Sequence, residues 1–192
     1  MGKTKGQEHD VGAADLGLLV LRLAVGGLLA GHGAQKLFGW FGGGGLEGTG
    51  GFLESMGYRP GKQWALLAGL SEFGGGTLMA LGLLHPIGAI SSMGAMTMAT
   101  LDVHTGKPIW SSQGGAELPI INISAATALT LLGPGAFSLD HALGIRVPKG
   151  LALLAALAVT GGVVVAETRP MPLPEQAADA APSDTSAEAQ AS

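Results

Sequence analysis

The sequence predicts an all-α membrane protein, a polytopic helical bundle of four core transmembrane helices followed by a fifth helix near the C-terminus. Of its 192 residues, 47% are hydrophobic and 12% are charged, whereas a soluble domain carries about 25% charged residues. The charges also cluster in the tails and loops and leave long apolar runs between them. Because so few charges cannot cover the surface of a globule, the bilayer is the expected environment.

The abundance of glycine and the absence of cysteine narrow the classes of function. The chain has 34 glycines and no cysteine. Glycine destabilises a soluble helix by about 1 kcal/mol relative to alanine, whereas in a bilayer small residues let helix backbones approach closely. Without cysteine, this chain can form no disulfide and no cysteine-ligated cofactor site. The formal net charge of −4 lies mostly in the C-terminal tail, so no nucleic-acid partner is expected.

The first apolar run covers residues 16–38. About 20 helical residues cross the hydrocarbon core, so this run is long enough to be a transmembrane helix. Within it, Gly27 and Gly31 have the small-xxx-small spacing that suits close helix packing. A glycine-rich loop over 39–63 follows, and it contains a predicted short interfacial helix at 48–56.

Three further apolar runs complete the predicted core, at 64–84, 87–103 and 118–132. The first two are separated by a tight turn at His85 and Pro86, because proline disfavours a helical conformation in the residue before it. With the first helix, these runs predict a four-helix membrane domain.

The last part of the chain predicts a fifth helix and a tail. The apolar run at 151–166 has about 16 residues, which is short for a membrane span. A fifth transmembrane helix within 146–169 is predicted, and an interfacial helix or a packed hairpin is the alternative. Residues 170–192 are rich in Pro, Ala, Asp, Glu, Gln and Ser and cannot bury a core, so they are predicted to be disordered. The polar residues 1–15 are predicted to form a second disordered tail.

Ionisable residues inside the apolar runs indicate a candidate site. A charge at the bilayer centre costs about 2.5–3.5 kcal/mol, so Arg22, Glu72 and Asp102 require partners or a function. At 100° per residue, small residues share a helix face with each of them, which predicts that these faces point into the bundle. Because successive helices alternate in direction, most ionisable groups are predicted to converge in the half of the bundle that carries loops 39–63 and 104–117. The groups predicted to converge are His32, Lys36, Glu72, Asp102, His104 and Glu117.

Each of these residues also has a purely structural interpretation. Arg22 and Glu72 could form an ion pair within the bundle, and Lys36 could extend its ammonium group to the lipid head groups. His32 could bond a neighbouring carbonyl group. Asp102 could cap its helix or pair with a lysine of the following loop.

Two other patterns do not favour a cofactor site. Residues 43–48 formally match the GxGxxG pattern of dinucleotide-binding proteins, but neither a preceding strand nor a βαβ unit is predicted around them. The spacing of His32 and His104 specifies no metal or haem site, so no metal is predicted.

Several segments resemble the DoxX family of small integral membrane proteins. The most specific are HGAQKLFG at 32–39 and GGGGLEGT at 42–49, supported by AGLSEFGGGTLMALGLL at 68–84 and by pieces within 114–144. The resemblance covers about residues 15–145 and implies a compact DoxX-like four-helix domain over 16–145. The family pattern marks Arg22, His32, Gln35, Lys36 and Glu72. With these, the candidate polar pocket comprises Arg22, His32, Gln35, Lys36, Glu72, Asp102, His104 and Glu117.

The resemblance also implies a redox association. Relatives include a membrane subunit of thiosulfate:quinone oxidoreductase and an actinobacterial oxidoreductase that works with a sulfurtransferase and superoxide dismutase. We therefore expect a multi-pass protein of a bacterial-type plasma membrane, a component of a quinone- or sulfur-compound-linked redox complex. Its expected partners are the lipid bilayer and soluble redox enzymes, and its candidate cofactor is a quinone. The alternatives are a small-solute or proton-coupled transporter and a non-catalytic anchor for soluble redox enzymes.

Overall fold

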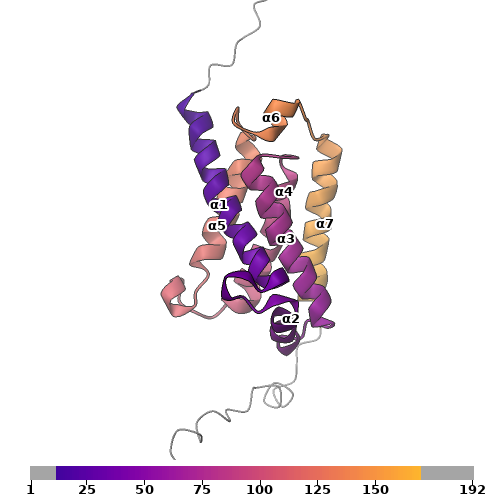
Figure 1. Cartoon of the computed structure of the whole chain (residues 1–192). Helices are drawn as coiled ribbons and strands as arrows, with labels where there is room; N and C mark the ends of the chain where they lie inside the picture. The colour runs from indigo at the N-terminus through magenta and orange to yellow at the C-terminus, as the bar shows by residue number, and fades with distance from the viewer. Residues whose placement is uncertain (1–11, 170–192) are drawn as a thin grey trace, which may run out of the picture.

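The computed structural model describes residues 12–169, and all regular structure within this range is helical. Figure 1 shows the helices as an upright bundle with short helices at both ends. The long helices are α1 (Ala13–Phe38), α3 (Gly61–Leu81), α4 (Ile87–Met98), α5 (Glu117–Leu132) and α7 (Lys149–Glu167). The short elements are η1 (Trp40–Gly42), α2 (Gly45–Ser55), the π-helical turn η2 (Ala99–Val103), η3 (Ser111–Gln113) and α6 (Leu139–Leu143).

The predicted all-α membrane bundle is confirmed. The helices α1, α3 and α7 are long and apolar enough to cross a membrane, and Ile87–Val103 and α5 are shorter apolar helices. The fifth apolar run forms one continuous helix of 19 residues, so the hairpin alternative is wrong. At the N-terminus, α1 begins at Ala13, which puts residues 13–15 in the helix and not in the predicted tail. The remaining tail predictions, for 1–11 and 170–192, lie outside the described residues.

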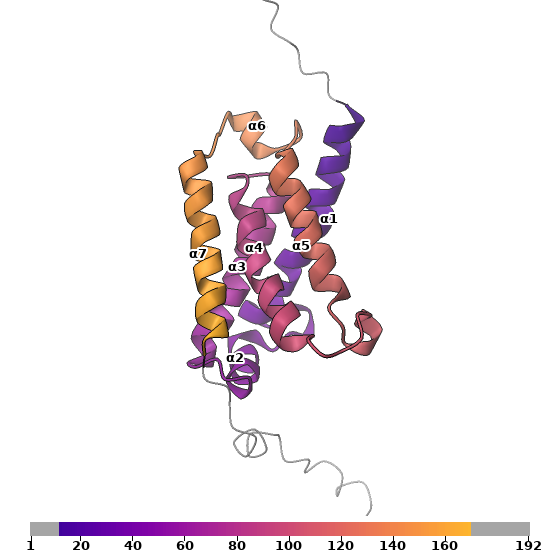
Figure 2. The ribbon, with the colours of Figure 1, turned by 180° about the vertical axis from the view of Figure 1, so that it is seen from behind.

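The long helices alternate in direction, which defines two ends of the bundle (Figures 1 and 2). The α2 end carries residues 39–60 and 104–116 and the C-terminal end of α7. The α6 end carries the start of α1, the turn at 82–86 and the segment 133–148. Seen from behind, α5 and α7 lie on either side of α4.

The closest packing in the bundle joins α1 to α3 through glycine. A Cβ atom placed on Gly26 would lie 2.6 Å from the carbonyl oxygen of Gly76 and 2.6 Å from the backbone nitrogen of Ala80. One placed on Gly33 would lie 2.2 Å from the backbone nitrogen of Phe73. Only glycine permits this approach, which fixes the antiparallel register of the two helices.

The predicted packing role of Gly27 and Gly31 is wrong. A Cβ atom on either residue would meet nothing within 4 Å. The reason is the rotation of α1 about its axis. Arg22 is buried with Gly26, Leu29 and Gly33 on one face, and Gly27 and Gly31 are turned away from that face.

This difference gives a matched pair of variants. Gly26→Ala should lower the free energy of unfolding by about 1–3 kcal/mol, because the added methyl group overpacks the contact with the α3 backbone. Gly27→Ala should be neutral or stabilising by up to about 1 kcal/mol, because alanine favours the helix and has room there. Unfolding in detergent micelles, followed by circular dichroism, measures both. Equal stability of the two variants would contradict the glycine-mediated contact.

Candidate functional site

A cavity of about 480 Å³ lies within the bundle near the α2 end. This volume is in the range of small-molecule sites, which hold about 300–1,000 Å³. Its wall is built from α1, α2, α3, α4 with η2, α5 and α7, and apolar side chains make up most of it. Apolar members of the wall include Phe52, Leu53, Met56, Trp64, Leu67, Ala68, Ala95, Met98, Val159 and Val163.

An ion pair between Lys36 and Glu72 lies on the cavity wall. The Nζ atom of Lys36 on α1 is 2.5 Å from Oε2 of Glu72 on α3. The Glu72 side chain is 3% exposed and that of Lys36 is 30% exposed. Lys36 thus pairs within the bundle, and the interpretation that it reaches only to the lipid head groups is wrong.

Arg22 lies away from this cavity, near the α6 end. Its guanidinium donates hydrogen bonds to the carbonyl oxygens of Pro134 and Phe137. The structural interpretation in which Arg22 forms an ion pair with Glu72 is therefore wrong. The physical reason is the register set by the glycines, because Gly26 faces Ala80 and Arg22 in consequence lies against Gly82.

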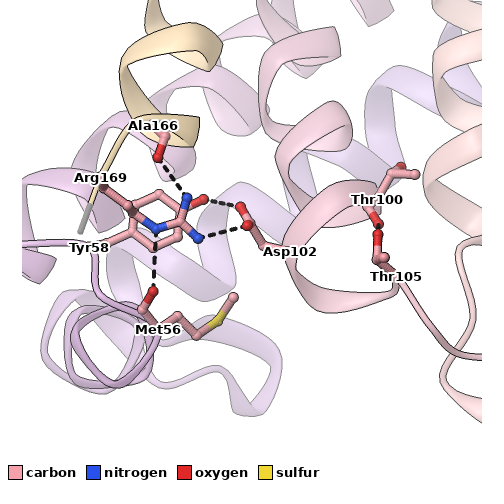
Figure 3. A network of polar contacts seen from close by, with 7 residues as sticks. All are labelled: Met56, Tyr58, Thr100, Asp102, Thr105, Ala166 and Arg169. Atoms are coloured by element: carbon pink, nitrogen blue, oxygen red, sulfur yellow. Dashed lines mark hydrogen bonds and ion pairs between the residues drawn. The ribbon is translucent and has the colours of Figure 1, made fainter. Parts of the chain in front are cut away.

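Asp102 belongs to a cluster that fastens the C-terminal end of α7 to the α2 end. Its Oδ1 atom is 2.6 Å from Nη2 of Arg169, and its Oδ2 atom accepts the hydroxyl hydrogen of Tyr58. The Arg169 guanidinium lies 3.7 Å from the Tyr58 ring centroid and donates to the carbonyls of Ala166, at 2.6 Å, and Met56, at 3.3 Å. Figure 3 shows the guanidinium between these partners. We call Met56, Tyr58, Asp102, Ala166 and Arg169 the Arg169 cluster.

The hydrogen bond from Tyr58 to Asp102 depends on Tyr58 staying protonated. Burial raises the pKa of Tyr58, and the hydrogen bond to Asp102 raises it further. The phenol is therefore neutral at physiological pH and acts as a donor. Asp102 has two strong partners in this cluster, so the interpretations that it caps the helix or pairs with the following loop are wrong.

Sequence reasoning missed Tyr58 and Arg169. Asp102 lies on the π-helical turn η2, and such turns are frequent at functional sites because they displace a side chain from the regular helical rows. A π-turn has no clear signature in a single sequence. Arg169 is the first cation after the fifth apolar run, but the sequence does not show which helix α7 packs against.

The two candidate histidines differ in their surroundings. The Nδ1 atom of His104 is 2.6 Å from the carbonyl oxygen of Gly114. A carbonyl only accepts, so Nδ1 of His104 carries a hydrogen, and in the neutral ring Nε2 is then an acceptor. His32 is exposed and its Nδ1 lies 3.1 Å from Oε1 of Gln35, not at a carbonyl of the backbone. Both histidines line the cavity.

The remaining candidates lie outside the cavity wall. Gln35 donates weakly to the carbonyl oxygen of Phe41, at 3.4 Å. Glu117 accepts from the backbone amide of Ser111, at 2.9 Å. The structure thus brings His32, Lys36, Glu72, Asp102 and His104 to one cavity, and it leaves Arg22, Gln35 and Glu117 elsewhere.

The glycine-rich segment 43–48 lies in helical surroundings in the described part of the chain. Residues 43–48 lead from η1 into the first turn of α2, and no strand occurs between residues 12 and 169. Within the same range, no group of three or more His, Asp and Glu side chains could hold a metal ion.

Comparison with known proteins identifies the family. The DoxX family model matches residues 17–105, which run from α1 through η2. No match to the chain was found among curated proteins or among solved structures. The matched segment contributes α1 to α4 to the cavity wall, whereas α5 and α7 come from the residues after it. With its long apolar helices and a DoxX domain at 17–105, this chain is an integral membrane protein of the DoxX family.

Proposed function

We propose that the protein is a multi-pass component of a plasma-membrane redox complex and that its cavity binds a quinone. The observation that carries this proposal is the composition of the cavity wall. The wall is largely apolar and holds the Lys36–Glu72 ion pair. Three of the helices that form it, α1, α3 and α7, are long and apolar enough to span a bilayer. Such a wall suits a lipid-soluble ring that bears a few hydrogen-bonding oxygens.

The polar groups of the wall complement a quinone. When bound, a quinone supplies the electron-accepting chemistry of the complex. Lys36 has three N–H donors, of which one reaches Glu72, so another can donate to a quinone oxygen and help to protonate it. The Nε2 atom of His104 can accept the hydrogen of a quinol hydroxyl group. These residues orient the ring and exchange protons.

A partner would deliver the electrons to this site. By resemblance to other DoxX proteins, the partner would be a soluble redox enzyme, such as a sulfurtransferase working together with superoxide dismutase. The Arg169 cluster and α2 lie at the same end of the bundle as the cavity, which makes this end the expected docking side.

Tryptophan fluorescence provides a direct test of quinone binding. Trp64 lines the cavity, and Trp40 and Trp110 are exposed residues outside it. The measurement uses the Trp40→Phe/Trp110→Phe variant in lipid nanodiscs, in which Trp64 is the remaining tryptophan. A quinone without an isoprenoid tail should quench the fluorescence of Trp64, and the quenching should reach a plateau as the quinone concentration rises. Ala68→Leu, which adds methyl groups to the cavity wall, should weaken this binding by roughly tenfold because of overpacking.

Ala158→Leu is the matched control. Ala158 is an exposed residue of α7 that does not line the cavity, so this variant should bind as the parent does. Quenching that rises linearly with quinone and is identical in both variants would contradict the proposal. Solute flux into liposomes that hold only this chain would instead indicate a transporter. Capture of a soluble enzyme, unchanged by Ala68→Leu and without quinone binding, would indicate an anchor.

A further inference from the structure

The cavity is covered at the α2 end. Phe52, Leu53 and Met56, which belong to α2 and the residue after it, form part of its wall. Beside them, the Arg169 cluster ties α7 to Asp102 and to the backbone of Met56. A ligand arriving from water at this end would meet these contacts first.

Unlike the α2 end, the side of the bundle between α3 and α7 is open. Leu67 on α3 and Gly162 on α7 both line the cavity, yet Leu67 is 59% exposed and Gly162 is also exposed. The helix α7 packs against α4, and it has no comparable packing against α3 in the described part of the chain. The cavity therefore reaches the surface between these two helices.

This opening lies within the apolar helices. Leu67 is about 9 Å along α3 from its start, and Gly162 is about 7.5 Å along α7 from its end, at 1.5 Å per residue. Both helices are long and apolar enough to cross a membrane. At this depth in a bilayer, the opening would face hydrocarbon chains and not water.

We propose that the ligand enters sideways from the bilayer, between α3 and α7, and that it is a quinone with a long apolar chain. The inference rests on the quinone-binding function proposed above. The ring lies against the Lys36–Glu72 pair, and the chain lies in the opening beside Leu67 and Gly162, where it remains in contact with lipid. The buried ring and the lipid-solvated chain then each have a matching environment.

Gly162 provides the test because its surroundings are empty. A Cβ atom on Gly162 would meet nothing within 4 Å. We therefore expect a phenylalanine at this position to fill the opening and to leave the packing of the helix backbones unchanged. Its neighbour Gly161 is also exposed and also has nothing within 4 Å, but it does not line the cavity. Gly161→Phe is therefore a matched control on the same helix.

The experiment compares two quinones in nanodiscs, one tailless and one with a long polyprenyl chain, by quenching of Trp64. Gly162→Phe should weaken binding of the long-chain quinone by roughly tenfold or more and leave the tailless one nearly unchanged. Gly161→Phe should change neither. Because the chain has no cysteine, Gly162→Cys and Gly161→Cys can each be labelled with an uncharged maleimide. The long-chain quinone should slow labelling at position 162 and not at position 161.

The outcomes separate the two proposals. If both phenylalanine variants bind both quinones as the parent does, the lateral route is wrong and the quinone site stands. If Gly162→Phe weakens both quinones equally, residue 162 faces the ring and the assignment of the chain to this opening is wrong. If neither quinone quenches Trp64 saturably in the parent protein, the quinone site itself is wrong, and the inference fails with it.

Discussion

Lys36→Met should lower the free energy of unfolding by about 3–5 kcal/mol, the range found when one partner of a buried ion pair is removed. Methionine keeps most of the aliphatic stem of the side chain and removes the charge. The Glu72 carboxylate, 3% exposed, would then lack its partner in an apolar setting. Thermal unfolding in nanodiscs of fixed lipid composition measures the loss.

Two further variants identify the cause of that loss. Glu72→Gln should be less harmful, because the Lys36 side chain is 30% exposed and its ammonium group can turn towards the membrane surface. The double variant Lys36→Met/Glu72→Gln should be more stable than Lys36→Met alone, because it leaves no unpaired buried charge. If the double variant loses the sum of the two single losses, the pair is not an interacting unit.

Arg169→Leu should release the C-terminal end of α7 and lower the free energy of unfolding by about 3 kcal/mol or more. The Arg169 side chain is 8% exposed and that of Asp102 is 12% exposed, so Asp102 would lose a desolvated counter-ion. The contact of the guanidinium with the Tyr58 ring adds about 0.5–2 kcal/mol to the loss. Limited proteolysis should cut the variant faster near α7, and unfolding in nanodiscs gives the magnitude.

Arg169→Lys should restore only part of the stability. A lysine ammonium lacks the planar fork that reaches Asp102 and two carbonyl groups at once and also stacks on the ring. Arg146→Leu is the surface control, because Arg146 is exposed in the segment before α7 and such substitutions stay within about 0.5 kcal/mol. Should Arg169→Leu behave like Arg146→Leu, the cluster would contribute nothing to holding α7.

The positions of the helices could be predicted because they depend on local composition. Apolar runs of suitable length and glycine or proline at their ends place α1, α3, α4, α5 and α7 to within a few residues. The buried face of α1 could also be predicted. A charged Arg22 is unfavourable in contact with lipid, and small residues lie on the same face of the helix. The first turn of α1 could not be assigned from composition, because the charged Asp15 separates Ala13 and Ala14 from the apolar run that starts at Leu16.

The partners of the charged residues could not be predicted, because they depend on the register between helices. Arg22 and Lys36 share one face of α1 and lie about 21 Å apart along it. The shared face alone does not show which of the two reaches Glu72, and the pair considered from the sequence was Arg22 with Glu72. The contacts of Gly26 and Gly33 with α3 decide between them. Nothing local to α7 indicates that Arg169 reaches Asp102, since this contact joins residues 67 positions apart.

The hydrogen bonds made by Arg22 affect whether a solute could cross the bundle from the cavity to the α6 end. Its guanidinium is buried and donates hydrogen bonds to the carbonyl oxygens of Pro134 and Phe137. Beside it, the Asp140 carboxylate accepts hydrogen bonds from the backbone amides of residues 84 and 85. Each hydrogen bond to a charged group contributes about 1.5–3 kcal/mol, and a path from the cavity to the α6 end would break several at once. We therefore expect the cavity to be closed towards the α6 end and to exchange its ligand with one leaflet of the bilayer. We expect no net transport of solutes between the two aqueous compartments.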